Sequence, residues 1–264
     1  MHTAALAAVD QEQLASYRAA IEAADTPEAK GLAIAVASDF RDTGWADWQA
    51  DADMVLKNQY GESSTRKMTL RALEQVEEGD KRLINFDHPR DVKGTAFLVF
   101  THKVGNDDRW LYLPALKRVK RISSSNQSGP FVGSEFSYED LNSQEVEKYE
   151  YKYLRDEVYE GKDCYVLERY PVDEDSGYQR QINWIDKAEF RVLKTDYYDR
   201  RGDLLKTLTQ TGWVEYQPGY WRADTFAMKN HQNGKSTDLV WSDHTFSQGM
   251  SDRDFNKNSL KRVR

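Results

Sequence analysis

The 264-residue sequence predicts a mainly β fold, in which two N-terminal helices precede an antiparallel meander that curls into a barrel or half-barrel. Two observations support this fold class. After Gly44 the chain reads as about a dozen extended segments separated by short turns rich in Gly, Asn and Asp. Aromatic residues make up 12% of the chain, with fifteen Tyr and seven Trp, and these residue types favour a pleated sheet.

Helical periodicity is confined to the start of the chain. Apolar residues recur at helical spacing over 10–24, which predicts a first helix. Thr26 and Pro27 then form a pair typical of an N-cap and a first helical turn, so we expect a second helix that ends at about Arg41. Its apolar residues predict that one face packs against a broad surface.

The rest of the chain is dominated by strand-like segments joined by hairpin turns. One of them, 95–103, is apolar on both faces, so we expect both faces to be covered, and the two helices are the expected cover. A curved sheet beneath helices encloses a space, which either side chains or a ligand must fill. The predicted strands are 48–58, 63–76, 82–88, 95–103, 109–113, 116–122, 147–159, 164–172, 178–186, 190–200, 204–216, 220–230 and 236–246.

A basic run follows the strand at 109–113. Four cations within five residues repel one another, so most chains would spread them out. Two interpretations remain open: an edge strand that charge protects against aggregation, or a docking surface for anionic headgroups or an acidic partner. The run consists of Lys117, Arg118, Lys120 and Arg121.

The loop that comes next carries apolar residues where polar ones are usual. Phe131, Val132 and Phe136 therefore need a pocket, a partner or a ligand. The segment 134–143 reads as a short helix, with Ser134 or Ser137 as its N-cap.

Motifs for catalysis or for metal binding are not apparent. The histidines lack metal-ligand spacing, and phosphate-binding loops and nucleophile elbows are missing from the sequence. The acidic clusters at 139–140 and 173–175 are interpreted as solvated turns or caps. The single cysteine, Cys164, lies in a strand-like run where a buried structural role is expected. A hydrolase that uses Cys164 or a serine of 123–125 is kept as a remote alternative.

Charge and hydropathy limit the partners of the chain. A net charge of -7 argues against a general nucleic-acid binder. No run approaches the roughly 20 apolar residues of a membrane-spanning helix. The Ala-rich start, followed by acidic and polar residues, resembles the sequence near a signal-peptide cleavage site. We expect an exported protein whose signal peptide has been removed, with an added Met1.

Five long blocks of sequence carry a resemblance to a known family. The chain resembles the periplasmic outer-membrane lipoprotein-sorting proteins of the LolA-like superfamily, in the branch commonly encoded beside RND/MMPL-type exporters. The resemblance extends from about Gly31 to the C-terminus, and blocks of this length are far more specific than a short motif. The blocks are 86–103, 107–141, 168–178, 220–243 and 251–262.

The resemblance implies one domain over 1–264: N-terminal helices at 1–44, then a curved sheet at 45–264 with a lid loop at 123–145. It implies a half-open antiparallel barrel of about 11 strands whose helices close a hydrophobic cavity. It further implies a non-enzymatic periplasmic carrier of lipoprotein acyl chains or other lipids, with an RND/MMPL exporter as partner and only transient membrane contact. No cofactor and no metal are expected. A non-carrying exporter adaptor is the alternative.

Each part of the site then has candidate residues. Phe131, Val132 and Phe136 would form the lid. Lys117, Arg118, Lys120 and Arg121 would meet a lipid headgroup or the exporter. The cavity-lining candidates could equally be ordinary core residues; they are Met54, Leu56, Met68, Leu70, Phe97, Val99, Leu111 and Leu113.

Overall fold

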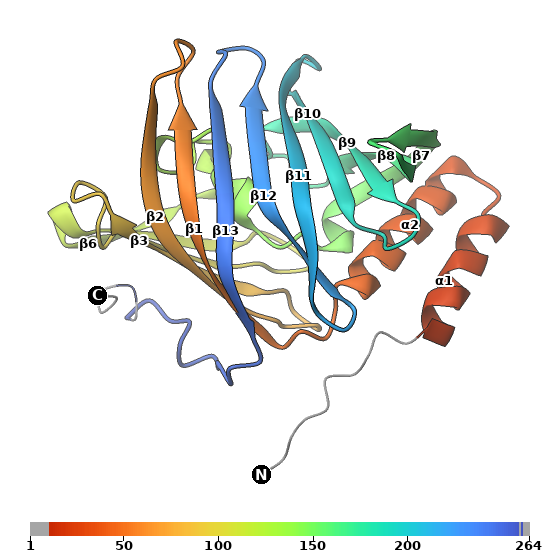
Figure 1. Cartoon of the computed structure of the whole chain (residues 1–264), viewed down its shortest axis with the longest axis horizontal. Helices are drawn as coiled ribbons and strands as arrows, with labels where there is room; N and C mark the ends of the chain where they lie inside the picture. Colours follow the sequence, from red (N-terminus) through yellow and green to blue (C-terminus); the bar gives the residue numbers. More distant parts are fainter. Residues whose placement is uncertain (1–10, 259, 261–264) are drawn as a thin grey trace.

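The computed structural model describes residues 11–258 and 260, which form two α-helices, five short 3-10 helices and thirteen strands (Figure 1). Met1 and most of the predicted cleavage-site segment lie within 1–10, outside the described residues. The helices are α1 (Gln11–Ala23) and α2 (Pro27–Arg41). The strands are β1 (Asp47–Lys57), β2 (Ser63–Leu73), β3 (Lys81–His88), β4 (Ala96–Phe100), β5 (Asp108–Leu113), β6 (Arg118–Ile122), β7 (Tyr149–Tyr159), β8 (Lys162–Pro171), β9 (Tyr178–Asp186), β10 (Val192–Asp199), β11 (Leu204–Gln217), β12 (Tyr220–Asn230) and β13 (Ser236–Phe246).

Both predicted helices are present, and the second is capped as expected. The Thr26 hydroxyl accepts a hydrogen bond from the Ala29 backbone N–H at 3.1 Å, and Pro27 opens the helix. α2 packs closely against β7, where a Cβ on Gly31 would lie 2.9 Å from the backbone nitrogens of Lys152 and Tyr153. Glycine at position 31 therefore permits the helix to approach the strand.

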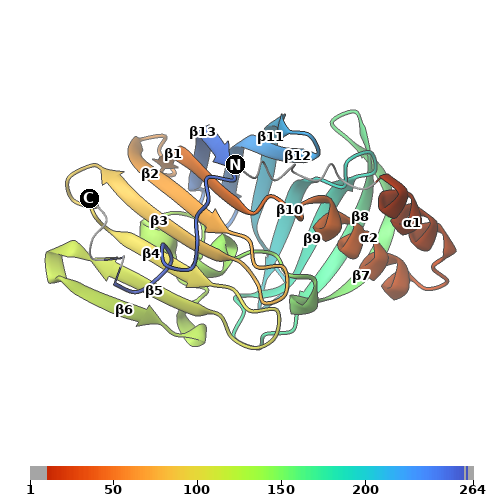
Figure 2. The same ribbon diagram turned by 90° about the horizontal axis from the view of Figure 1, so that it is seen from below.

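The thirteen strands of the described chain form one antiparallel sheet in the order β6-β5-β4-β3-β2-β1-β13-β12-β11-β10-β9-β8-β7. Each of the thirteen predicted segments corresponds to one of these strands, whereas the expected total of about 11 was too low. β1 pairs with β13, so the first and last strands lie together at the centre of the sheet. β6 and β7 are the two edges, and the sheet bends into an arch that does not close (Figure 2).

The connection from β6 to β7 determines what fills the arch. It must lead from one edge of the sheet to the other, and its short 3-10 helices, including Phe131–Gly133 and Tyr138–Leu141, lie on the inner side of the arch (Figure 2). The predicted short helix is the second of these turns. Ser137 caps it through a capping box, in which Asp140 accepts from the Ser137 backbone N–H.

The cover of β4 differs from the expectation. Its inner face packs with Phe131 of the connection, and its outer face packs with Phe255 and Leu260 of the C-terminal segment. The two helices instead cover the inner side of β7–β9, in a separate apolar cluster that includes Ile34. A strand that is apolar on both faces indicates that both faces are covered. Its own sequence does not indicate which distant segment covers each face. The helices therefore do not roof the predicted lining residues.

None of the helices in the described part of the chain is long and apolar enough to cross a membrane.

Candidate functional site

The eight predicted cavity-lining residues lie together on the inner face of the sheet. They occupy alternate positions on β1, β2, β4 and β5, so their side chains all point into the arch. Met54 and Phe97 are completely buried there, while Leu56 and Leu113 are partly buried at the margin of the same apolar cluster. The cluster continues onto β12 and β13 through Met228 and Leu239.

The predicted lid is also part of this cluster. The Phe131 ring is fully buried, with its centroid 5.6 Å from that of Phe86 and 5.4 Å from that of Phe97. Tyr138 packs edge-on against Phe131 at 5.7 Å. Phe136 is buried and Val132 packs against the cluster from its margin. The space inside this half of the arch is therefore occupied by the protein's own loop, and we call residues 130–141 the plug.

The plug has its own tight backbone structure. Phe131 donates its backbone N–H to the Phe136 carbonyl at 2.7 Å, so the tip folds back on itself. Val132 adopts a φ of 48°, a left-handed conformation that is costly for a β-branched residue. Arg66 of β2 donates a hydrogen bond to the Val132 carbonyl and helps to hold this turn against the sheet.

A polar latch fastens the plug to the opposite half of the sheet. The Lys206 ammonium of β11 lies 2.6 Å from the Asp140 carboxylate and 3.0 Å from the Glu135 carbonyl. The side chains of this ion pair are only 5% and 3% exposed. Tyr178 of β9 donates its hydroxyl to the other Asp140 oxygen at 2.7 Å. We call Lys206, Asp140 and Tyr178 the latch.

Glu135 adds a second attachment. Its carboxylate accepts hydrogen bonds from the Asn230 amide at 2.7 Å and from the Asn233 amide at 3.2 Å, and its backbone N–H donates to Thr237 at 3.0 Å. All three partners lie in β12, in β13 or in the turn between them. The plug thus contacts both the β11 side and the β12–β13 hairpin.

Glu139 lies beside the latch as a partly buried acid. Burial is the main cause that raises its pKa to about 7, and the neighbouring Asp140 carboxylate adds to the rise. Hydrogen bonds from the Ser176 hydroxyl at 2.8 Å and from the Gly177 backbone N–H at 2.9 Å act in the opposite direction. Glu139 therefore changes its charge near neutral pH at the point where the plug meets the β8–β9 turn.

A second network holds the chain just after the plug. Arg109 of β5 is 2% exposed and donates to Asp107 at 2.7 Å and to the Asn142 side-chain oxygen at 3.3 Å. Asn142 in turn donates to Asp107 at 2.7 Å, and Lys148 lies 2.9 Å from the same carboxylate. The segment that follows the plug is therefore attached to the β5 side of the arch.

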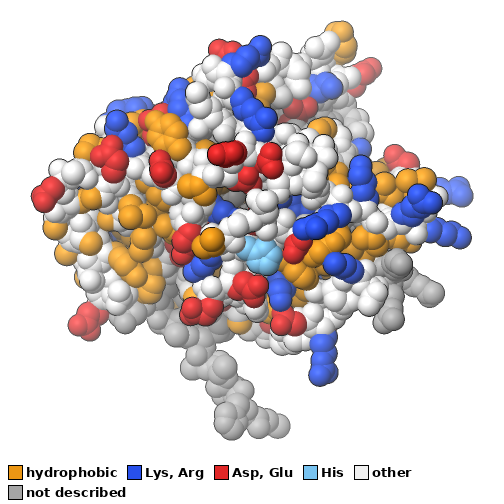
Figure 3. All heavy atoms as spheres, turned by 180° about the vertical axis from the view of Figure 1, so that it is seen from behind, with side chains coloured by type: hydrophobic (Ala, Val, Ile, Leu, Met, Phe, Trp, Pro, Cys, Tyr) orange, Lys and Arg blue, Asp and Glu red, His pale blue; other side chains and the backbone are white. Residues whose placement is uncertain are grey.

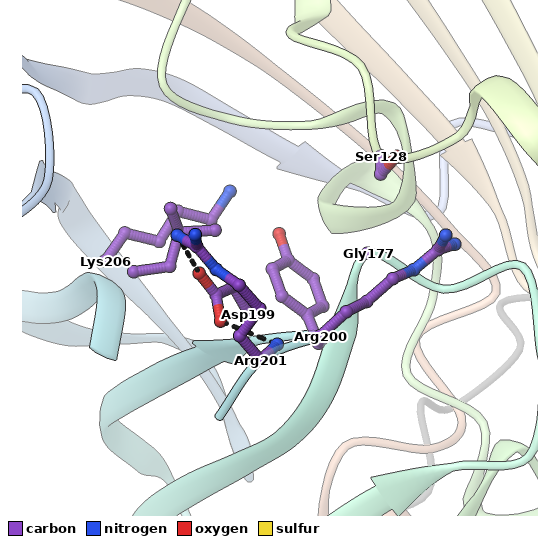
Figure 4. Close-up of a pocket in the computed structure, with 8 residues that line it drawn as sticks. Ser128, Gly177, Asp199, Arg200, Arg201 and Lys206 are labelled. Carbon is purple, nitrogen blue, oxygen red and sulfur yellow. Dashed lines mark hydrogen bonds and ion pairs between the residues drawn. The ribbon is translucent and has the colours of Figure 1, made fainter. Parts of the chain in front are cut away.

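Two pockets open beside the plug, and both are bordered mainly by polar side chains. One, of about 340 Å³, is bordered by Ser128, Gly177, Tyr178, Asp199, Arg200, Arg201, Leu205 and Lys206 (Figure 4). The other, of about 330 Å³, lies between Glu135 of the plug and the tips of the β1–β2 and β12–β13 hairpins. The first pocket reaches the latch lysine.

The predicted basic run forms the edge strand β6 and the turn before it. All four cations are exposed, and Arg121 lies 2.6 Å from Asp108 of β5. In Figure 3 Lys and Arg side chains gather around hydrophobic ones at the edge of the molecule where β6 lies. Leu116, 63% exposed, is part of this basic and apolar surface. The edge is remote in sequence and in strand order from the latch on β11.

Two candidate nucleophiles, the Cys164 thiol and the serine loop at 123–125, lie outside the arch cluster and differ in their surroundings. Burial raises the pKa of the Cys164 thiol to about 11, which leaves little thiolate near neutral pH. In the serine loop, the Ser123 hydroxyl shares a hydrogen bond with the Ser125 hydroxyl at 3.0 Å and accepts one from the Asn126 side-chain amide at 2.8 Å. Within the described residues no group of three or more His, Cys, Asp or Glu side chains is placed to hold a metal ion.

The latch is the part of the site that sequence reasoning missed. The sequence predicts a solvated turn or cap at Glu139 and Asp140; Asp140 is part of a capping box, but both side chains also face buried partners. Lys206 alternates with outward-facing Thr207 and shares the inner face with Leu208, which is buried. The register of β10 and β11 in the folded chain places Lys206 opposite Tyr197 on the inner face, and the sequence alone carried no signal of that register.

Comparisons with known proteins fit this architecture. A family model described as "Uncharacterized protein" matches residues 78–262. A crystal structure titled "putative outer membrane lipoprotein-sorting protein domain", from Vibrio parahaemolyticus, is 57% identical, with a TM-score of 0.87 over 88% of this chain and 99% of that one. A DUF1329 family protein from Desulfovibrio piger is 32% identical, with a TM-score of 0.84 over 89% of this chain and 99% of that one. No curated protein sequence gives a match.

A more distant structure shares the fold. A LolA superfamily protein from Nitrosomonas europaea has a TM-score of 0.70 at 21% identity, over 89% of this chain and 100% of that one. The arched antiparallel sheet with two N-terminal helices is thus the LolA-like fold. Given the identity and coverage of the Vibrio parahaemolyticus domain, this chain belongs to the family of that outer-membrane lipoprotein-sorting protein domain, and it has the LolA-like fold.

Proposed function

We propose that this protein is a non-enzymatic periplasmic carrier, which binds an acyl chain of a lipoprotein or of another lipid inside the arch and passes it toward the outer membrane. The observation that carries the proposal is the inner apolar cluster, in which the eight lining residues meet the rings of the plug. The plug is a connecting loop, fastened to the sheet by a few polar contacts. An alkyl chain would take the place of Phe131 and Phe136.

The two opposing free-energy terms of this exchange are similar in size for a long alkyl chain. Each CH₂ removed from water contributes about 0.8 kcal/mol, so one acyl chain contributes on the order of 10 kcal/mol before entropy costs. Displacing the plug exposes two buried phenylalanines and breaks its polar contacts, which costs a comparable amount. Loading and release would then be close to balanced, as a carrier requires.

The basic edge at β6 fits the docking step of such a carrier. Lys117, Arg118, Lys120 and Arg121 would contact anionic headgroups of a membrane or an acidic surface of an RND/MMPL-type exporter. Edge strands also pair readily with strands of other proteins. The exporter as partner rests on the resemblance to its branch of the family.

The test is extraction of the purified, detergent-free protein with organic solvent, followed by mass spectrometry of the bound lipid. A stoichiometric acylated species, either co-purified or acquired during incubation with membrane lipids, is the expected result. A blank in both conditions would contradict the carrier function.

One observation favours a second candidate, a non-carrying adaptor of an exporter. The protein's own aromatic side chains fill the inner face of the arch, and most residues that border the two pockets beside the plug have polar side chains. An adaptor with a permanently filled arch would remain empty of lipid in both extraction experiments. It would instead be recovered with an inner-membrane exporter after cross-linking.

A further inference from the structure

The latch suggests what kind of cargo can displace the plug. The hydrogen bonds of the Lys206 ammonium go to two groups of the plug, the Asp140 carboxylate and the Glu135 carbonyl. Its other neighbours are the rings of Tyr178 and Tyr197, whose centroids lie 5.3 Å and 5.4 Å from the ammonium nitrogen. The plug therefore supplies the anion that neutralises this lysine.

Opening the plug changes the electrostatics of the inner face. The Lys206 side chain is 5% exposed and is anchored on β11 in the middle of one half of the sheet, so it stays with the sheet when the plug leaves. Removing the carboxylate from a buried ion pair leaves an uncompensated buried charge. The free-energy cost of that charge is much larger than the net contribution of the intact ion pair to stability. A neutral alkyl cargo that displaced the plug would leave Lys206 in that state.

The pocket beside the latch offers an entry for a replacement anion. It has a volume of about 340 Å³ and reaches Lys206 from the rim formed by the β10–β11 turn. Its border carries three cationic side chains, Arg200, Arg201 and Lys206, and one carboxylate, that of Asp199 (Figure 4). Arg200 uses its guanidinium on the carbonyls of Ser176 and Asp175, both at 2.8 Å, so it stays in place at the rim.

We propose that the cargo is an anionic amphiphile, whose phosphate or carboxylate group replaces Asp140 at Lys206 while its alkyl chain replaces the aromatic rings of the plug. This inference rests on the proposed carrier function and names the class of its cargo. The Tyr178 hydroxyl, which now donates to Asp140 at 2.7 Å, would donate to the incoming anion in the same way. The plug thus acts as an internal substitute for both parts of the ligand.

The experiment compares amphiphiles that share an alkyl chain and differ in headgroup charge. Hexadecyl phosphate and hexadecanoate are the anionic probes and 1-monopalmitoylglycerol is the neutral one, with affinity measured below their micelle concentrations by quenching of tryptophan fluorescence or by calorimetry. We expect both anionic probes to bind at least about tenfold more tightly than the neutral one. The relative affinity of the two anions distinguishes a phosphate from a carboxylate cargo.

Variants at the latch test the assignment to Lys206. Asp140→Asn removes the internal anion, so the anionic probes should bind at least about tenfold more tightly, with a smaller change for the neutral probe. The double variant Lys206→Met/Asp140→Asn keeps the buried contact neutral and should lose the preference for anions. Lys229→Met is the matched control, because Lys229 is exposed on the outer face of the neighbouring strand β12. Circular dichroism confirms that each variant is folded.

The outcomes separate this inference from the proposed function. Tight binding of all three probes with equal affinity, unchanged in the double variant, would support the carrier and overturn the anionic cargo. A preference for anions that persists in the double variant would place the anion site elsewhere and overturn the role of Lys206. Failure of every probe to bind any folded variant, including Asp140→Asn, would contradict the carrier function itself, and with it the cargo class.

Discussion

Glu139 is a carboxyl group that the fold keeps largely from water, at the contact between the plug and the β8–β9 turn. Burial first, and then the negative charge of Asp140, raises its pKa to about 7, while Lys206 acts in the opposite direction. Two further acids behave alike: burial raises the pKa of Asp80 to about 7 and that of Asp39 to about 6. The folded protein thus holds protons near neutral pH that the unfolded chain releases.

A pH-dependent stability follows for Glu139. Because its pKa is higher in the folded state, the folded state takes up a proton between about pH 7 and pH 4.5 that the unfolded chain does not, and the free energy of unfolding rises as pH falls through this window. Glu139→Gln removes this contribution, so the variant should gain less stability than the wild type between about pH 8 and about pH 5. Urea unfolding at several pH values measures the difference.

The control for this prediction is Glu174→Gln, which neutralises an exposed carboxylate in the neighbouring turn. It should follow the wild-type pH profile. If Glu139→Gln also follows the wild-type profile, Glu139 is not the group that makes the free energy of unfolding depend on pH in this range.

At the residue scale, a substitution of Phe131 tests whether the loop at 130–141 is a displaceable plug or a permanent part of the core. Truncation of a buried Phe costs about 3–5 kcal/mol. In Phe131→Ala this loss of stability affects only the state in which the plug fills the arch. We therefore expect acyl probes to bind the variant at least about tenfold more tightly than the wild type. Phe255→Ala removes an equally buried ring from the outer face and should lower the stability without raising the affinity. Equal affinity in both variants would show that the plug does not compete with the ligand.

At the scale of the element, β6 is an edge strand whose exposed side chains are mostly cationic. Charge on an edge prevents non-specific pairing with other strands, and the same charge attracts anionic surfaces. The two interpretations differ in a measurable way, because only the second makes transfer to a membrane depend on β6.

The double variant Arg118→Glu/Arg121→Glu tests this dependence. Both side chains are exposed, so folding should be preserved to within about 1 kcal/mol, including the loss of the Arg121–Asp108 ion pair. Transfer of a bound fluorescent lipid to anionic vesicles should become at least about tenfold slower, and the defect should shrink at high salt. The matched control is Lys152→Glu/Lys162→Glu, which reverses two exposed cations on the edge strand β7 and its neighbour β8. If transfer is unchanged, the charge on β6 only protects the edge.

At the scale of the whole molecule, two segments that are not strands cover the two faces of β3–β5. The plug covers the inner face and the C-terminal segment covers the outer face, where Phe255 and Leu260 are buried. Lys81 pairs with Asp252 at 2.6 Å and Lys257 lies 4.4 Å above the Trp110 ring, so the segment also has polar contacts. The outer cover belongs to a different apolar cluster from the plug, on the face of the sheet opposite to it.

Truncation after Gly249 should therefore separate stability from ligand binding. Loss of two large buried side chains costs about 4 kcal/mol, which corresponds to a fall in Tm of about 10 °C for a chain of this size. Thermal unfolding followed by circular dichroism measures it. The affinity for acyl probes should be preserved at temperatures where the variant is folded. Its loss would show that the two faces of the sheet are coupled, and an unchanged Tm would show that the outer cover is dispensable.

Local patterns in the sequence account for much of this molecule. Alternation along 48–58 and 63–76 determines that Met54 and Met68 share one face, and the turn residues determine where each strand ends. The Thr26 and Ser137 caps are equally local. Such features depend on neighbours within a few residues, so the strands, both helices and the inward-facing set of the candidate site were predictable.

The tertiary structure alone decided which distant segments meet. Asp140 reaches Lys206 across 66 residues, and β1 pairs with β13 at opposite ends of the chain. The helices cover β7–β9, while a loop and the C-terminal segment cover β4. These contacts depend on the twist and register that accumulate over many strands, which no local pattern encodes. For that reason the sequence determined an arch with an apolar inner face, and only the folded chain determined that its own plug fills it.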